Sequence, residues 1–600
     1  MMSKLRSVRR LPAICLIPLL LAAAVGRAYA DPGDLPDYGQ NGAADFQSWT
    51  GNGGGNQTAY LGAIGGEGET GYFGAGDGGA ASAVLDLTAD WLAAGSVTAR
   101  GGDGGRPGPD NWYFGRYGTG ADGTASAVLR GAGAVGAATA YGGAYRGFNP
   151  AYPSAGSASS SITAWTSGAM AVDLSSNAYS GSGGGSSTAT LYVDSGVAQP
   201  AAGNASVTGR VSAIGSGGYE TGDSRATLTL YGNGSLSGTS MAQAADSIND
   251  PYTGGSTAGG ASSSVIGVTR GNHDVTLNSS AKSGNAAFFG AGAADATVSG
   301  QSGSGKVLVK ADANANMTQH QDSRATALAT ARTTEWGGVS EAHASALGDI
   351  VSARAQAYSV GGNATAVASG AGLTGSVSAE SGSSGSNRAV LASASGTVPY
   401  NAAITATAQT AFGGASPALP VLGSDPMALV VAIDGGAAGV GSGAQAALLG
   451  DDLYYGGYVS LRGEHQWQSD TAQHLWINLL GATAVGEFYA LDFSITNNGA
   501  VLYSHSFGSV EEANLFFNNH LLDLGALAAG AQDLVITSGL SATSAGFGFN
   551  YTLAVPEPMA WLLMLSGLTV VMLAARRKSK AGLGAPDLFQ AKAGGGLILG

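Results

Sequence analysis

The sequence predicts a mainly β protein in which a Gly/Ala/Ser-rich, repetitive β-solenoid-like region is followed by an antiparallel β-sandwich and a single C-terminal membrane helix. Three observations predict this order. Short alternating apolar and polar segments recur through the first two thirds of the chain, and alternation of this kind is typical of strands. Large apolar side chains become frequent after about residue 428, and an uncharged run near the C-terminus ends in a basic cluster.

Residues 1–30 have the order of a secretory signal peptide. Four basic residues precede the apolar run 11–26, and Ala28 and Ala30 occupy the −3 and −1 positions before Asp31. We expect export by Sec-type secretion machinery and cleavage after Ala30. An uncleaved N-terminal anchor helix is the alternative, although the apolar run is short for a membrane span.

Composition excludes several classes of function. The only cysteine, Cys15, lies in the signal segment, so the mature chain has no disulfide, thiolate nucleophile or Cys-ligated metal. Residues 31–575 contain 39 acids and 16 bases, a net charge of −23. Such a chain repels phosphates, and we therefore expect no nucleic acid partner.

Residues 31–416 form the predicted degenerate β-repeat region, because alternating segments recur about every 25 to 45 residues, as in repeat arrays. Gly pairs and triples between them predict turns and strand breaks. A flexible Gly/Ala/Ser spacer is the alternative. The predicted strands cover 81–87, 125–129, 188–193, 226–231, 274–277 and 306–310, and the glycines include 101–102, 183–185, 217–218, 259–260 and 361–362.

A Pro-containing linker at 417–427 separates this region from a predicted β-sandwich-like domain at 428–554. Ser509 before two glutamates predicts an N-capped short helix, and Asn497-Asn498-Gly499 predicts a hairpin turn. Short apolar segments at regular spacing are typical of a sandwich. These segments are 429–433, 458–461, 475–480, 487–495, 501–507, 533–537 and 546–551.

The C-terminal segment 555–578 combines three features in a fixed order. Pro556, Glu557 and Pro558 precede an uncharged run, Met559–Ala575, which is long enough for a short membrane helix. Arg576, Arg577 and Lys578 follow, and such a cluster favours the cytoplasmic side.

Together with the signal peptide, this order resembles the PEP-CTERM sorting signal of exported proteins in Gram-negative bacteria that make exopolysaccharide. The resemblance implies recognition of Pro556, Glu557 and Pro558 by an exosortase, and retention by Arg576, Arg577 and Lys578. It also implies transient anchoring in the inner membrane, then transfer to the outer envelope or extracellular matrix. Residues 579–600 form an atypical tail, because family members usually end soon after the basic cluster. An ordinary single-pass anchor is the alternative.

The sequence predicts no catalytic, metal or cofactor site. The Gly66–Gly71 segment matches a phosphate-binding pattern, but its two glutamates would repel phosphate, and the histidines lack metal-ligand spacing. We therefore expect a non-enzymatic structural or adhesive protein of the cell envelope or exopolysaccharide (biofilm) matrix, with exopolysaccharide as a candidate partner.

Two alternatives place a site in the terminal domain. The first is a carbohydrate-binding module on an extended stalk, with an aromatic platform drawn from Tyr454, Tyr455, Tyr458, Trp467 and Trp476. The second is a polysaccharide-cleaving enzyme, which would need two carboxylates across one bond; these could come from Asp451, Asp452, Glu464 and Asp470.

Overall fold

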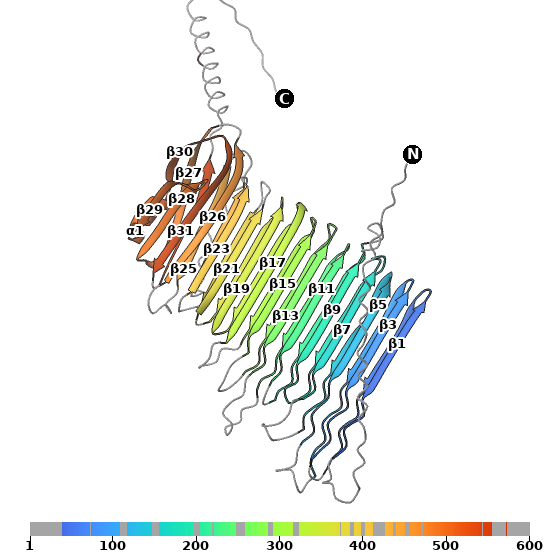
Figure 1. The fold of residues 1–600 in the computed structure, drawn as a ribbon. Coiled ribbons are helices and arrows are strands. Elements are labelled where there is room, and N and C mark those ends of the chain that lie inside the picture. The colour runs from blue at the N-terminus through green and yellow to red at the C-terminus, as the bar shows by residue number, and fades with distance from the viewer. Residues whose placement is uncertain are drawn as a thin grey trace, which may run out of the picture. The chain divides into compact units, whose positions relative to one another are not determined.

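Two sixteen-stranded sheets contain most of the residues that the computed structural model describes (Figure 1). The described part is 39–554 and Met572. It leaves out 72–73, 109–116, 147–154, 197–203, 219–220, 248–257, 286–291, 316–322, 373, 384–388, 398–401, 412–426, 436–439, 450–456, 470–471 and 543. All described strands belong to one compact unit, Tyr38–Gly600. The prediction of a mainly β, solenoid-like protein is confirmed.

Sheet 1 contains the odd-numbered strands up to β23, followed by β26, β31, β28 and β29. In sheet order the strands are β1 (Asp45–Gly53), β3 (Ala81–Ala89), β5 (Gly123–Gly131), β7 (Ala158–Thr166), β9 (Ser187–Ser195), β11 (Ser224–Gly232), β13 (Ala261–Thr269), β15 (Ala294–Ser302), β17 (Arg324–Trp336), β19 (Ile350–Val360), β21 (Thr374–Ser383), β23 (Ala402–Ala411), β26 (Gly457–Ser469), β31 (Gly530–Ala542), β28 (Ala490–Asn497) and β29 (Ala500–Phe507).

Sheet 2 contains the even-numbered strands up to β24, followed by β25, β32, β27 and β30. In sheet order the strands are β2 (Gln57–Ile64), β4 (Leu92–Arg100), β6 (Gly133–Tyr141), β8 (Val172–Tyr179), β10 (Val207–Ile214), β12 (Leu236–Gln243), β14 (Val275–Lys282), β16 (Lys306–Asn314), β18 (Val339–Leu347), β20 (Ala364–Ala371), β22 (Ala389–Thr397), β24 (Met427–Gly435), β25 (Val440–Leu449), β32 (Ser544–Ala554), β27 (Gln473–Glu487) and β30 (His520–Leu527).

The first eleven pairs of strands form a β-solenoid. Each coil consists of one odd strand, a short arc, one even strand and a return segment, and each strand pairs in parallel with its equivalent in the next coil. Hydrogen-bonded partners in adjacent coils are 36 residues apart at Asn41 and Asp77, 42 at Asp77 and Thr119, and 24 at Gln356 and Glu380. The coils therefore shorten toward the C-terminus while the strand register is kept.

The core between the sheets is thin because glycines in one sheet face large side chains in the other. A Cβ added to Gly95 would lie 2.7 Å from Leu129 and 2.8 Å from Leu85. A Cβ added to Gly209 would lie 2.8 Å from Leu228. Because glycine has no Cβ, the two sheets approach closely at these positions without leaving a cavity. Protein interiors are generally close-packed in this way.

Buried serines continue the core where no large side chain is present. Ser263 Oγ donates to Ser240 Oγ at 2.9 Å, and Ser279 Oγ donates to Ser263 Oγ at the same distance. Ser240 Oγ in turn donates to the carbonyl of Ala226. Because buried hydroxyls cost free energy unless they are paired, this chain of bonds makes polar residues acceptable between the sheets.

Glycine-rich return segments form an additional layer in the first coils, beyond the ends of the strands (Figure 1). Their glycines recur every third residue, as in Gly39 and Gly42 or Gly102 and Gly105, which matches the period of a polyproline II helix. Backbone bonds run to the same segment in the next coil and also across to the opposing segment. One column of backbone hydrogen bonds crosses the layer, in which the amide of each residue donates to the carbonyl of the residue named before it, at 2.7–3.0 Å. In order, these residues are Ala43, Gly66, Gly79, Gly102, Ala121, Gly143, Gly156 and Gly181.

At its closely packed glycines, this layer leaves no room for a side chain. A Cβ added to Gly66, Gly79 or Gly102 would come within 3.0 Å of an opposing backbone. The glycine clusters predict turns or strand breaks, and the positive φ of Gly183, Gly184 and Gly361 is of the kind that glycine turns adopt. At Gly101-Gly102 strand β4 ends, and the two glycines lie in an extended packed segment and not in a turn.

The strands from β24 onward pair antiparallel, except for the parallel pair of β23 and β26. Helix α1 (Val510–Phe517) begins after Ser509, whose side chain accepts from the amide of Glu512, so the predicted cap is confirmed. The predicted turn is also confirmed, since Asn498 and Gly499 have φ of 49° and 78° between β28 and β29. The predicted strand 487–495 is divided, because β27 ends at Glu487 and β28 begins at Ala490.

The boundaries 31–416, 417–427 and 428–554 stay predictions. Within the described residues, both sheets continue from the solenoid into the C-terminal strands, through β23 to β26 in sheet 1 and β22 to β24 in sheet 2. Residues 1–30, most of the linker and nearly all of 555–600 lie outside the described residues.

Candidate functional site

The predicted sorting residues cannot be placed. Ala28, Ala30, the motif at 556–558 and the cluster at 576–578 all lie outside the described residues. Across the described residues, no helix has both the length and the apolar character needed to cross a membrane. Candidate sites in the described part must therefore come from the solenoid and the C-terminal strands.

Most aspartates of the return segments bond to the next coil. In each case a carboxylate oxygen accepts from a backbone amide of the following coil, at 2.7–2.8 Å. A carboxylate that accepts a backbone N–H is held in place, and the backbone amide of the following coil is satisfied. The pairs in the return segments are Asp77 and Thr119, Asp103 and Ala144, Asp122 and Ser157, Asp223 and Gly260, and Asp246 and Asn285. Asp274, in the arc between β13 and β14, accepts from Lys306 in the same way.

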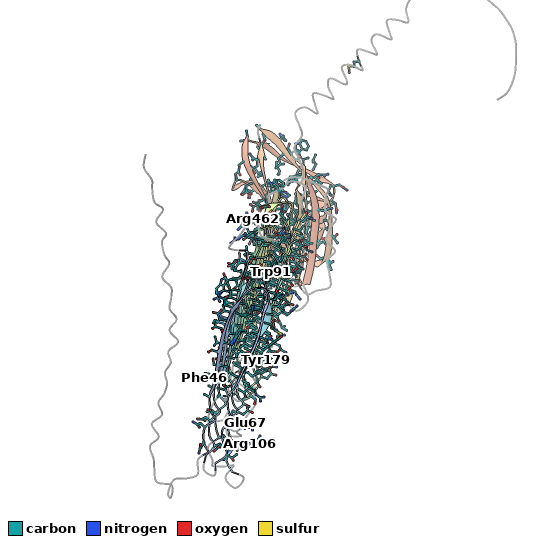
Figure 2. All side chains as sticks on the ribbon, turned by 90° about the vertical axis from the view of Figure 1, so that its right-hand side faces the viewer. Phe46, Glu67, Trp91, Arg106, Tyr179 and Arg462 are labelled. Atoms are coloured by element: carbon teal, nitrogen blue, oxygen red, sulfur yellow. The ribbon has the colours of Figure 1, made fainter. Side chains whose placement is uncertain are left out.

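One pair of carboxylates in the return segments shares a single cation. Glu67 and Asp103 both contact Arg146 Nη2, at 3.6 and 2.5 Å (Figure 2 labels Glu67). Asp103 is nearly buried and also accepts from the Ala144 amide. The guanidinium neutralises both carboxylates, whereas glycoside hydrolysis needs two carboxyl groups facing a sugar. This arrangement favours a structural ion cluster.

The carboxylate cluster predicted in the terminal domain is only partly described. Asp451, Asp452 and Asp470 lie outside the described residues. Glu464 accepts from Arg462 Nη2 at 2.9 Å, with only 12% of its side chain exposed. Glu464 is thus placed as one half of an ion pair.

The histidines have separate partners. His465 is fully buried between β-strands and bonds to the hydroxyl of Tyr551 at 2.9 Å. Burial lowers the pKa of His465 to about 3 and raises the pKa of Tyr551, because a charge on either group would lose its hydration. Among the described residues, no group of three or more metal-ligating side chains is gathered as a metal site would require.

The aromatic platform predicted in the terminal domain is represented by one described side chain. Trp476 is partly buried in β27, and its ring lies 5.8 Å from that of His474. Tyr454 and Tyr455, and the side chains of Tyr458 and Trp467, lie outside the description. Sequence reasoning did not single out the exposed aromatic residues of the solenoid: Phe46, Trp49, Tyr60, Trp91, Tyr141, Trp165 and Trp336.

The outer face of sheet 2 brings two of its tyrosines together. Tyr141 ends β6 and Tyr179 ends β8, and the two are register partners. Their rings stack with centroids 5.2 Å apart and 14° between the planes. Tyr179 lies on the opposite side of the stack from Phe46 of sheet 1 (Figure 2). The signal in the sequence is a tyrosine ending each of two strands, but only the register shows that they are adjacent.

Comparison with known proteins found no matching protein-family model and no matching curated protein. Function must therefore be argued from this chain's own residues.

Proposed function

We propose that this chain is an exported structural or adhesive protein of the cell envelope or exopolysaccharide matrix, sorted by an exosortase through its C-terminal segment. The observation that carries the proposal is the way in which the solenoid uses its polar groups. Its return-segment aspartates bond to adjacent coils, and its buried serines bond to one another. Such a stack spans distance and displays surface, and each coil is supported by its neighbours.

The two ends of the sequence support export and sorting. The signal-peptide order ending at Ala30 provides passage across the membrane, and the segment 555–578 has the order of a sorting tail. The absence of cysteine after Cys15 leaves backbone pairing and packing to hold the exported body. Two continuous sheets supply that pairing in the described part.

A localisation experiment tests the sorting. We expect the triple variant Pro556→Ala, Glu557→Gln, Pro558→Ala to remain in the inner-membrane fraction, while the wild type reaches the matrix. The control Pro417→Ala, Pro420→Ala changes two prolines outside the motif and should reach the matrix as the wild type does. Equal distribution of the triple variant and the wild type would contradict sorting through this motif.

A second experiment tests the structural role. We expect a strain lacking the chain to make a matrix that disperses at lower shear, and the wild-type gene to restore its cohesion. Unchanged cohesion, together with lost degradation of a polysaccharide, would instead support the polysaccharide-cleaving alternative.

A further inference from the structure

One row of outward side chains at the ends of the even strands differs in charge from the rest of the chain. The Arg100–Lys282 row consists of Arg100, Tyr141, Tyr179, Ile214, Gln243 and Lys282, which are successive register partners in β4 to β14. The residue before each of them is a buried alanine, so the row itself points away from the core. It contains two cations and no acid, in a chain of formal net charge −14.

Within sheet 2, the two cations of this row are distinguished by their lack of ion pairs. The strands β2 to β20 of sheet 2 carry five arginines and lysines. Arg210 pairs with Asp173 at 3.0 Å, Lys306 with Glu341 at 3.2 Å, and Lys310 with Asp312 at 3.1 Å. Arg100 and Lys282 are exposed, and neither has an ion-pair partner among the residues described.

Between these cations the row offers chemistry suited to sugars. Tyr141 is exposed and stacks on the partly buried Tyr179, and Gln243 presents an amide beside Lys282. Aromatic rings contact the apolar faces of sugar rings, and amides and guanidinium groups bond to hydroxyls and carboxylates. Five strand-to-strand steps separate Arg100 from Lys282, a span of about 24 Å along the solenoid. A linear polymer can follow such a row, whereas a compact ligand cannot reach both cations.

We propose that the Arg100–Lys282 row binds a linear anionic polysaccharide that lies across the even strands. This inference rests on the proposed matrix function and names the partner of the solenoid. The unpaired cations select a polymer with carboxylate or sulfate groups, and the tyrosine pair and the amide favour a glycan over a nucleic acid.

The test is sedimentation of the purified exported chain with alginate, a linear polyuronate, in parallel with dextran sulfate, neutral dextran and duplex DNA. We expect binding to alginate or dextran sulfate, and the preferred polymer identifies carboxylate or sulfate as the anionic group. The variant Arg100→Gln, Lys282→Gln should bind about fivefold or more weakly, as expected for two exposed charge contacts. The variant Tyr141→Thr, Tyr179→Thr should also bind more weakly, because threonine preserves strand propensity but removes the rings.

The matched control is Arg225→Gln, Arg324→Gln, which removes two exposed cations from sheet 1 and changes the net charge equally. We expect this control to bind as the wild type does. Three results would each overturn the proposal. They are an equal loss of polysaccharide binding in both charge variants, binding to DNA as strong as binding to the anionic polysaccharides, and binding to neutral dextran that neither variant changes. A chain that reaches the matrix but binds none of the polymers would refute this inference while leaving the proposed function standing.

Discussion

Replacing Gly102 with alanine tests whether the glycine-rich layer is a packed part of the solenoid. Its amide donates to the Gly79 carbonyl at 2.8 Å, and a Cβ there would come within 3.0 Å of the Gly66 carbonyl. The obstacle is backbone, so no side chain can move aside. Overpacking typically costs about 1–3 kcal/mol, and loss of the hydrogen bond adds about 1 kcal/mol. We expect Gly102→Ala to destabilise the first coils by roughly 2–4 kcal/mol.

The control for this substitution is Gly62→Ala in β2, where the nearest atom to an added Cβ is the Thr98 carbonyl oxygen at 4.0 Å. Neither glycine has a positive φ, so both gain the same reduction in unfolded-state entropy. We expect Gly62→Ala to be neutral or to stabilise by about 0.4–1 kcal/mol.

Hydrogen exchange measured by mass spectrometry on segments of the chain is the suitable assay, because repeat proteins open locally. A loss of 2 kcal/mol should speed exchange about 30-fold in peptides around 60–110, and leave those around 290–350 unchanged. Equal exchange in Gly102→Ala and Gly62→Ala would refute the packed-layer account.

Three further predictions concern the bonds between coils, the core and the terminal strands. Asp274→Ala should destabilise the coil by about 1 kcal/mol, because the Lys306 amide loses its acceptor, while Asp274→Asn should restore most of this; thermal melting compares the two. Leu228→Ala should cost about 2–5 kcal/mol in chemical denaturation, since Leu228 is fully buried against glycines of sheet 2, whereas Thr229→Ala on the outer face should cost little. Burial lowers the pKa of His465 to about 3, so unfolding binds a proton between about pH 6.5 and 3, and the stability of these strands should fall as pH falls through that window. In a His465→Gln variant, the dependence of stability on pH between 6.5 and 5 should be lost. An unchanged dependence in that range would exclude His465 as its cause.

The sequence predicts one strand in six of the eleven coils, four in sheet 1 and two in sheet 2, because large inner residues alternate clearly with outer residues there. In β3, Leu85 and Leu87 alternate with polar residues, and this strand was predicted. Strand β6 of sheet 2 has only Ala and Gly at its inner positions, so the sequence shows no clear alternation there, although these positions face the core. Small inner residues in sheet 2 make room for the leucines of sheet 1, and this complementarity depends on contacts between strands that no local pattern records.

The hydrogen bonds between coils, and the rows of side chains that cross several coils, could not be predicted from the sequence for a related reason. Coil length varies, so the sequence does not tell which residue lies beside Asp274 or Tyr141 in the next coil. A one-residue change in register would send every side chain to the other face. The sequence alone therefore shows the aspartates only as separate charges between strands. It does not show that the residues of the Arg100–Lys282 row lie side by side.

The most direct test of the account is the intact mass of the mature protein recovered separately from membrane, extracellular-matrix and medium fractions. The account predicts a matrix or medium form that begins at Asp31 and ends near Pro556, with the signal segment removed and the sorting tail processed. If all of the protein stays in the inner membrane with 559–600 attached, sorting by an exosortase is contradicted, and the chain is a membrane-anchored domain instead.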